Sequence, residues 1–222
     1  MNILERTFSK WRRMTRRGMK NVFFDIYQHN EWNSLESVSG VGSSLEQTEG
    51  VRLSLPFVFK EFRVKKLLDA PCGDFHWMKT VDLTDIDYIG GDIVEAIIKE
   101  NQTRFKSATH DFILLDITSD VLPQADMMLC RDCLIHFSNK DVYRFLNNLK
   151  KSQITYLLTT TFPQHLNNNI KTGNWRPINL EDAPFHFPKP LALINEGCTE
   201  KDGAVADKSL GLWRVADINT TS

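Results

Sequence analysis

The sequence has little cysteine, no long apolar run and almost no net charge, and each of these shortages excludes a class of protein. Four cysteines in 222 residues are too few for a disulfide-stabilised scaffold, so we expect a reduced, cytoplasmic protein. No apolar run is long enough to form a bilayer-spanning helix. The 27 Lys and Arg balance 28 Asp and Glu, and a net charge of −1 argues against nucleic acid as a partner.

Composition divides the chain into an N-terminal extension and a main domain that contains a long loop. Residues 1–35 form a basic N-terminal extension with apolar side chains at helical spacing, namely Leu4, Phe8, Trp11 and Met14. We expect this helix to pack on the rest of the chain, with weak contact to a membrane surface as the alternative. Residues 36–222 form the main domain. Within it, 161–190 holds five of the eight prolines, which predicts a long ordered loop rather than a helix.

Short apolar runs alternate with helical patterns along the main domain. The predicted strands are 64–70, 86–93, 112–117, 125–131, 154–160, 191–197 and 209–218. Helical periodicity covers 94–105 and 139–151, where Ser138 is placed to cap the second helix, and Ser44 has the spacing to cap a helix that runs to Phe62. Strands that alternate with helices predict an α/β fold with a doubly wound, Rossmann-like, mostly parallel seven-stranded sheet. The last two strands are joined by a polar turn, so we expect them to form an antiparallel pair.

The loop after the first strand, in the stretch "LLDAPCGDF", indicates which ligand the sheet binds. In such folds the ligand lies beyond the carboxyl ends of the strands, which here carry Asp69, Asp92 and Asp116. Asp92 has the spacing of an acid that binds ribose hydroxyls. Pro71 removes an amide donor and Asp74 adds a carboxylate, and both features oppose a pyrophosphate. A nucleoside with positive groups and no phosphate, such as S-adenosylmethionine, therefore suits this loop better than a nicotinamide dinucleotide.

Four stretches, in this order, resemble the motifs of class I S-adenosylmethionine-dependent methyltransferases: "LLDAPCGDF", "YIGGDI", "LLDIT" and "ADMMLCRDCLIHFS". The first keeps Asp69 and Gly73 of that family's glycine-rich motif but has Pro71 and Phe75 in place of the outer glycines. Three further stretches, "ESVSGVGSSLEQT", "TGNWRPINLEDAPFHFP" and "LINEGCTE", are similar to a group of bacterial methyltransferase-like proteins over nearly the full length. The resemblance implies the fold and the cofactor, and it leaves the acceptor open.

The resemblance also implies roles for residues at the strand ends. Asp92 is expected to bind the ribose hydroxyls of S-adenosylmethionine and Asp116 its adenine amino group. Gly73 would let the loop backbone approach the methionine part of the cofactor, whose ammonium Asp69 would orient. Cys130, at the end of the fourth strand, is assigned to the same cofactor site.

The candidates for the chemistry lie after the fourth strand and in the long loop. Methyl transfer from a sulfonium is a direct displacement that needs a base only when the acceptor must lose a proton. Asp132 or His136 could remove that proton, and Arg131 could hold an anionic acceptor. In the loop, Trp175 and Arg176 pair a flat ring with hydrogen-bond donors, which suits a small or glycan-like acceptor.

The sequence thus predicts an enzyme that methylates an oxygen or a nitrogen of a small or glycan-like acceptor. Two alternatives stay open, a catalytically silent module that only binds the cofactor and a methyltransferase that modifies a protein side chain. A nucleotide-dependent oxidoreductase is disfavoured by the acidic loop. We expect no metal, because Cys130 and Cys133 have C-x-x-C spacing but the chain holds no second such pair.

Overall fold

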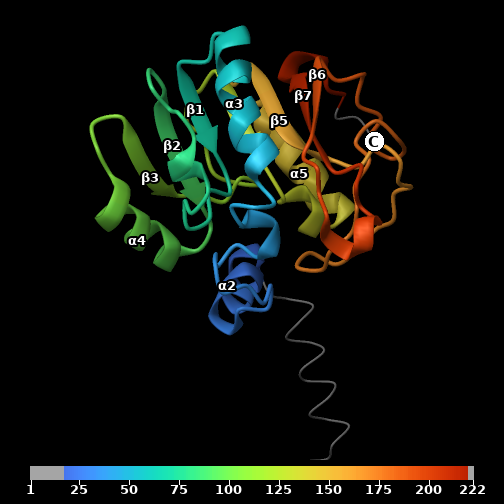
Figure 1. The fold of residues 1–222 in the computed structure, drawn as a ribbon. Helices are drawn as coiled ribbons and strands as arrows, with labels where there is room; N and C mark the ends of the chain where they lie inside the picture. Colours follow the sequence, from blue (N-terminus) through green and yellow to red (C-terminus); the bar gives the residue numbers. More distant parts are fainter. Residues whose placement is uncertain (1–17, 220–222) are drawn as a thin grey trace, which may run out of the picture.

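The computed structural model describes residues 18–219 and contains a seven-stranded sheet with helices on both faces (Figure 1). The strands are β1 (Lys66–Asp69), β2 (Asp87–Asp92), β3 (His110–Leu114), β4 (Met127–Cys130), β5 (Tyr156–Thr161), β6 (Ala192–Asn195) and β7 (Ser209–Arg214). Their order across the sheet is β3-β2-β1-β4-β5-β7-β6. The first five in this order are parallel, and β7 runs antiparallel to both β5 and β6. The predicted fold class is confirmed, including the antiparallel pair that ends the chain.

The third strand differs from its prediction. We expected a strand at 112–117, whereas β3 spans His110–Leu114. The apolar run continues because Leu115 and Ile117 are buried, but the backbone already turns there. The Asp116 carbonyl accepts a hydrogen bond from the Asp120 amide at 2.9 Å, so Asp116 lies in a turn beyond the strand.

The α-helices within the described residues are α2 (Met19–His29), α3 (Glu49–Glu61), α4 (Glu95–Phe105) and α5 (Asn139–Lys150). Short 3-10 helices occur at Val41–Ser43, Met78–Thr80, Leu134–His136, Glu200–Gly203 and Val215–Asp217. The predicted cap of α5 is confirmed, because the Asp141 amide donates to Ser138 Oγ at 3.2 Å. The Gln47 amide donates to Ser44 Oγ at 3.2 Å as predicted, yet α3 begins only at Glu49 because a turn separates the two.

The parallel strands are buried on both faces, so successive side chains point into two different apolar cores. Leu67 of β1 packs with Leu55 of α3 in the core that α3 and α4 cover. Its neighbour Leu68 packs on the opposite face with Phe145 of α5 and Phe185. Phe185 belongs to the long loop between β5 and β6, so this loop takes the place of a helix on that face.

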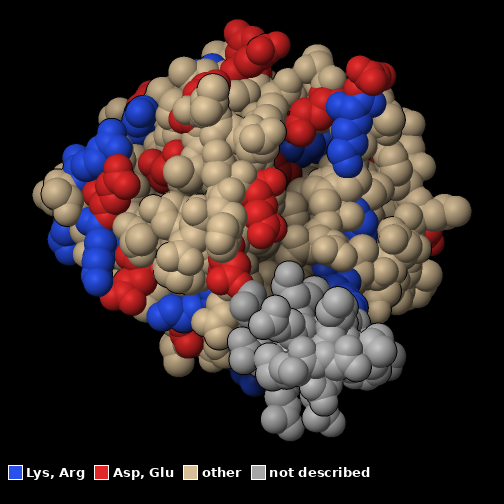
Figure 2. Space-filling model, turned by 90° about the horizontal axis from the view of Figure 1, so that it is seen from below, with Lys and Arg blue, Asp and Glu red and all other residues tan. Residues whose placement is uncertain are grey.

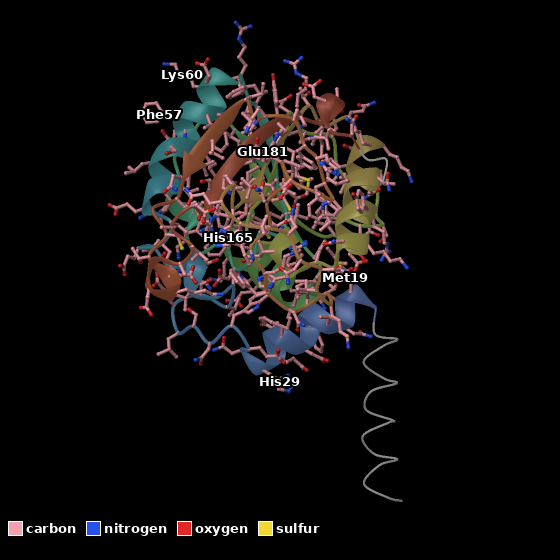
Figure 3. All side chains as sticks on the ribbon, turned by 90° about the vertical axis from the view of Figure 1, so that its right-hand side faces the viewer. Met19, His29, Phe57, Lys60, His165 and Glu181 are labelled. Atoms are coloured by element: carbon pink, nitrogen blue, oxygen red, sulfur yellow. The ribbon has the colours of Figure 1, made fainter. Side chains whose placement is uncertain are left out.

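Helix α2 lies below the sheet, at the carboxyl ends of the parallel strands (Figure 1). Figure 3 shows it from the side, with Met19 at its end near the rest of the domain and His29 at its far end. The strand order reverses between β1 and β4, so the ligand crevice of this fold opens at the same edge. No helix within residues 18–219 is long and apolar enough to cross a membrane. The apolar stripe predicted from Leu4 to Met14 lies outside the described residues.

Candidate active site

A cavity of about 270 Å³ opens at the carboxyl ends of β1, β2 and β4. The sheet order gives it two sides. The β1–β3 side is formed by Asp69 and by residues 71–74, 91–94 and 115–117. The β4–β7 side is formed by residues 131–133 and 135–137, Phe162, Trp175 and residues between 198 and 208. Helix α2, Trp32, residues 38–43 and Ile97 of α4 complete the lining. Acidic side chains gather near the middle of this face of the molecule (Figure 2).

The turn after β1 requires Gly73. Its φ is +54°, a left-handed conformation that side chains disfavour, and a Cβ at this position would lie 2.0 Å from Ser39 Oγ. The Gly73 amide donates to Asp92 Oδ2 at 3.1 Å, and its carbonyl accepts from Asn101 Nδ2 at 2.7 Å. The backbone at Gly73 is therefore held from both directions, and it lies at the wall of the cavity without a side chain of its own.

Two buried carboxylates, Asp69 and Asp92, end β1 and β2 side by side. Asp69 accepts a hydrogen bond from the Tyr88 hydroxyl at 2.7 Å, and Asp92 accepts from the Val94 amide at 2.9 Å and from Gly73. Burial raises the pKa of Asp69 to about 7, against the Tyr88 hydrogen bond. Burial likewise raises the pKa of Asp92 to about 6, against its backbone hydrogen bonds. Neither carboxylate is in an ion pair with a Lys or Arg of residues 18–219, so a cationic ligand would be favoured here.

The other two residues assigned to the cofactor differ in their access to the cavity. Asp116 lines it and orders its own turn, because its Oδ1 accepts from the Thr118 amide at 2.9 Å. Cys130 is fully buried in the apolar core and does not line the cavity. Its carbonyl accepts from Thr159 Oγ1 at 2.7 Å. The neighbouring thiol at the cavity wall belongs to Cys133.

Residues 32–43, the N-terminal cap, contribute Trp32 and residues 38–43 to the lining of the cavity. Asp74 anchors them: its Oδ1 accepts from Ser37 Oγ at 2.9 Å and its Oδ2 from the Val38 amide at 3.1 Å. At the other end, the Gly42 carbonyl accepts from Arg131 Nη2 at 2.8 Å. The cap thus links the loop after β1 to the loop after β4. Its residues 32–35 belong to the predicted N-terminal extension, and residues 36–43 belong to the predicted main domain.

A buried cluster of charges occupies the β4–β7 side. Arg131 pairs with Glu196 at 2.7 Å and with Asp132 at 3.2 Å, and Lys208 pairs with Asp132 at 2.6 Å and with Glu196 at 3.4 Å. The side chains of Arg131, Glu196 and Lys208 are at most 5% exposed. Burial alone would raise the pKa of Asp132, but Arg131 and Lys208 outweigh it and lower that pKa to about 2. Both Arg131 and Asp132 are therefore committed to each other and to their neighbours.

His136 is held as a neutral imidazole with one free nitrogen. Its Nδ1 lies 3.0 Å from the Asn174 carbonyl, which can only accept a hydrogen bond, so the ring proton sits on Nδ1. The ring stacks at 5.2 Å on Trp32 of the cap. Burial lowers the pKa of His136 below its usual value. Nε2 has no hydrogen-bond partner in the described part of the chain, and His136 lines the cavity, so Nε2 is a potential proton acceptor.

The structure separates the two residues proposed for the acceptor. Trp175 lines the cavity and packs edge-on against Phe162 at 6.3 Å. Arg176 is buried and does not line it. Its Nη1 donates to the Leu134 carbonyl at 2.7 Å and its Nε to the Asn168 carbonyl at 3.1 Å. The Arg176 guanidinium thus fastens the long loop to the segment that carries His136.

Comparison with known proteins decides the fold. No protein-family model matches the chain, and no curated protein matches it in sequence. The structure of human N-acetylserotonin methyltransferase in complex with SAM is similar, with a TM-score of 0.58 at 15% identity over 89% of this chain and 60% of the human one. The chain has the class I methyltransferase fold. The methyltransferase domain of bacterial CtHen1-CN is also similar, with a TM-score of 0.54 at 12% identity over 77% of this chain and 100% of its own. The structure of LaPhzM is similar as well, with a TM-score of 0.51 at 11% identity over 75% of this chain and 55% of its own.

Two residues of the site, Lys208 and Trp32, could not be predicted from any pattern in the sequence. Lys208 neutralises Asp132 across a separation of 76 residues, and Trp32 stacks on His136 from a segment that precedes the sheet. Neither lies in a motif or at the carboxyl end of a strand, because Lys208 directly precedes β7. Within residues 18–219, no group of His, Cys, Asp and Glu has an arrangement that could hold a metal ion.

Proposed function

We propose that the protein transfers a methyl group from S-adenosylmethionine to an oxygen or nitrogen of a small acceptor. The observation that carries the proposal is the neutral His136, which has a free Nε2 and lines a cavity that also contains carboxylates without a Lys or Arg partner among residues 18–219. A neutral imidazole with a free ring nitrogen suits an acceptor that must lose a proton. The fold supports the same reaction class, because the human enzyme of this fold was solved with SAM.

The residues of the β1–β3 side fit this cofactor. Each oxygen of Asp92 accepts one backbone amide and keeps a lone pair that can accept a ribose hydroxyl. Gly73 has no Cβ to keep a ligand away from the backbone. Asp69 and Asp74 bring negative charge without a Lys or Arg partner among residues 18–219, which favours a sulfonium and an ammonium and disfavours phosphate. We assign Asp116 to the adenine, since it follows β3 at the wall of the same cavity.

S-adenosylmethionine, when bound, supplies a methyl group on a positively charged sulfur. His136 accepts the acceptor's proton at Nε2 while its Nδ1–H remains bonded to the Asn174 carbonyl. Trp32 and the cap exclude water from this base and keep it neutral. We assign Arg131 and Asp132 to holding the β4–β7 side in place, because their charges already satisfy each other and Lys208.

Calorimetric titration tests the cofactor assignment. We expect S-adenosylmethionine and S-adenosylhomocysteine to bind and NADH not to bind. Asp92→Asn should weaken both ligands by roughly 10- to 100-fold, because a hydrogen bond to a charged group contributes about 1.5–3 kcal/mol. Asp87→Asn is the matched control, since Asp87 is an exposed residue at the opposite end of the same strand, and it should bind like the unmodified protein.

Three outcomes would contradict the proposal: neither ligand binds, NADH binds in their place, or Asp87→Asn weakens binding as much as Asp92→Asn. Cofactor binding without methyl transfer to a broad set of small hydroxyl and amino compounds would favour the silent binding module instead. Transfer to protein side chains alone would favour the other alternative. No feature of residues 18–219 supports either of them over a small acceptor.

A further inference from the structure

The β4–β7 side of the cavity is lined by flat rings that come from separate parts of the chain. Trp32 stacks on His136 at 5.2 Å with an interplanar angle of 32°. Trp175 and Phe162 meet edge-on at 6.3 Å. Phe23 of α2 also lines the cavity and packs on Phe137 at 6.0 Å. Aromatic walls around a base favour an acceptor with a flat, apolar ring.

Lys201 adds a positive charge at this aromatic wall. Its Nζ lies 2.8 Å from the centre of the Trp175 ring, and Lys201 lines the cavity. It is in no ion pair within the described residues, and burial lowers the pKa of its ammonium. Lys201 and its neighbour Asp202 both have positive φ, 54° and 53°, a conformation that is costly for residues with side chains. The turn thus holds the ammonium at the cavity at a cost in backbone strain.

The carboxylates near Lys201 form no ion pair with it within the described residues, although Glu200 attracts its ammonium at longer range. Arg131 and Lys208 share Asp132 and Glu196 between them. Glu200, beside Lys201 in the chain, turns toward the cap, since its Oε1 would lie 3.1 Å from a Cβ built on Gly42. Among the cations lining the cavity in residues 18–219, Lys201 is therefore the one without a carboxylate within ion-pair distance.

We propose that the acceptor is a planar, hydroxylated organic acid whose ring lies among these aromatic side chains and whose anionic group binds Lys201. This inference rests on the proposed function and names the substrate class for the same site. The acceptor hydroxyl reaches His136, which takes its proton at Nε2 as the oxygen–methyl bond forms and the sulfur–methyl bond breaks. Each half of the cavity then binds a ligand of opposite charge, a cationic one beside Asp69 and Asp92 and an anionic one beside Lys201.

Paired acid and amide probes test the proposal. A panel of hydroxybenzoic and hydroxynaphthoic acids, with the amide of each acid, is titrated into the full chain saturated with S-adenosylhomocysteine. We expect at least one acid to bind about tenfold more tightly than its amide, because an ion pair with a partly buried ammonium contributes at least one strong hydrogen bond. Lys201→Gln should remove the difference between acid and amide, and Lys201→Arg should keep most of it.

Two variants separate charge from packing and from surface effects. Trp175→Leu should weaken an acid and its amide equally, because it removes the ring and leaves the ammonium. Lys189→Gln is the control, since Lys189 pairs with Glu181 away from the cavity and is 91% exposed; it should leave the preference for acids unchanged.

Three results of these titrations would contradict the proposed acceptor class. Equal binding of acids and amides, an acid preference that survives Lys201→Gln, or no binding of any acid at millimolar concentration would overturn the proposed acceptor class. The same titrations without S-adenosylhomocysteine separate this inference from the cofactor assignment. If an acid preference that depends on Lys201 persists while S-adenosylhomocysteine does not bind, the ligand class stands and the proposed methyl transfer fails.

Discussion

The two sides of the cavity both bury carboxylates, yet the acidity of these groups changes in opposite directions. On the β1–β3 side, burial raises the pKa of Asp69 to about 7 and that of Asp92 to about 6. On the β4–β7 side, Arg131 and Lys208 overcome the effect of burial and lower the pKa of Asp132 to about 2. The residue type is the same and burial raises the pKa of all three carboxyls, so the difference lies in the partners.

This difference separates a side that needs a ligand from a side that is already complete. Asp69 and Asp92 are stabilised by hydrogen bonds alone, so a bound cation lowers the free energy of their charged forms. Asp132 and Glu196 have Arg131 and Lys208, so this cluster gains nothing from a ligand and serves as a rigid wall. A charged cluster of this kind also depends on every member, because removing one leaves the others buried and unpaired.

The largest loss of stability is expected when a member of the buried charge cluster on the β4–β7 side is removed. Among residues 18–219, Glu196→Gln leaves Asp132 as the only carboxylate in an ion pair with Arg131 and Lys208. We expect this change to lower the free energy of unfolding by about 3–5 kcal/mol. Urea denaturation measures the change. Glu95→Gln is the control, because Glu95 forms a 2.7 Å ion pair with Lys99 on the surface, with both side chains more than half exposed. It should barely move the midpoint, and equal losses in the two variants would contradict the distinct role of the buried cluster.

The junction between the cap and the β1 loop should give the next largest effect. Gly73→Ala forces a side chain into a left-handed conformation and toward Ser39 Oγ, and we expect it to lower the free energy of unfolding by about 2–3 kcal/mol. Gly197→Ala is the matched control, since Gly197 has a similar φ of +66° but no heavy atom within 4 Å of the added Cβ.

The difference between these two glycine variants isolates the contact with the cap. We expect Gly197→Ala to lower the free energy of unfolding by about 1 kcal/mol, the cost of the left-handed conformation alone. The loss of stability in Gly73→Ala beyond this amount should become smaller when Ser39→Gly is added, because that change removes Ser39 Oγ, the atom nearest to the new Cβ. Equal effects at the two glycines would mean that the cap does not press on the loop in solution.

The same two sides differ in how much of them the sequence could predict. Asp69, Gly73 and Asp92 follow directly from adjacent parallel strands, and a strand ends where its apolar run ends. Patterns of neighbouring residues were therefore enough to locate the β1–β3 side, as they were enough to identify Ser138 as the N-cap residue of α5. The displacement of β3 shows the limit of such rules, because buried Leu115 and Ile117 extended the apolar run past the last paired residue.

The β4–β7 side could not be predicted in the same way, because tertiary contacts assemble it. Glu196 and Lys208 reach the β4 loop over 65 and 76 residues, and the cap reaches Arg131 over 89 residues. An isolated Arg131 in the sequence predicts a free cation for an anionic acceptor, whereas the folded chain gives it two carboxylates. From the sequence, Arg176 was likewise predicted to donate hydrogen bonds to an acceptor, but its guanidinium donates to the backbone carbonyls of Leu134 and Asn168.

The smallest predicted effect depends on pH. A carboxyl whose pKa is raised from 3.8 to about 7 on folding holds a proton that the unfolded chain has lost, so its stabilising contribution falls as pH rises between these values. Asp69→Asn cannot ionise and should escape this loss. The raised pKa bounds the gain at about 4 kcal/mol, and we expect about 1–2 kcal/mol at pH 8, because a neutral amide forms a weaker hydrogen bond with the Tyr88 hydroxyl. Urea denaturation between about pH 4 and pH 8 measures it.

Asp132→Asn should have the opposite sign in the same experiment. Its pKa is lowered to about 2, so its charged form stabilises the fold at any pH above the unfolded value of 3.8 and is lost only as pH falls toward 2. At pH 8 the Asn variant therefore leaves Arg131 and Lys208 undercompensated and loses stability, while Asp69→Asn gains it, and near pH 4 the Asp69 variant should match the unmodified protein. A shift of the same sign in both variants at pH 8 would mean that the surroundings of the two carboxylates do not differ as their partners indicate.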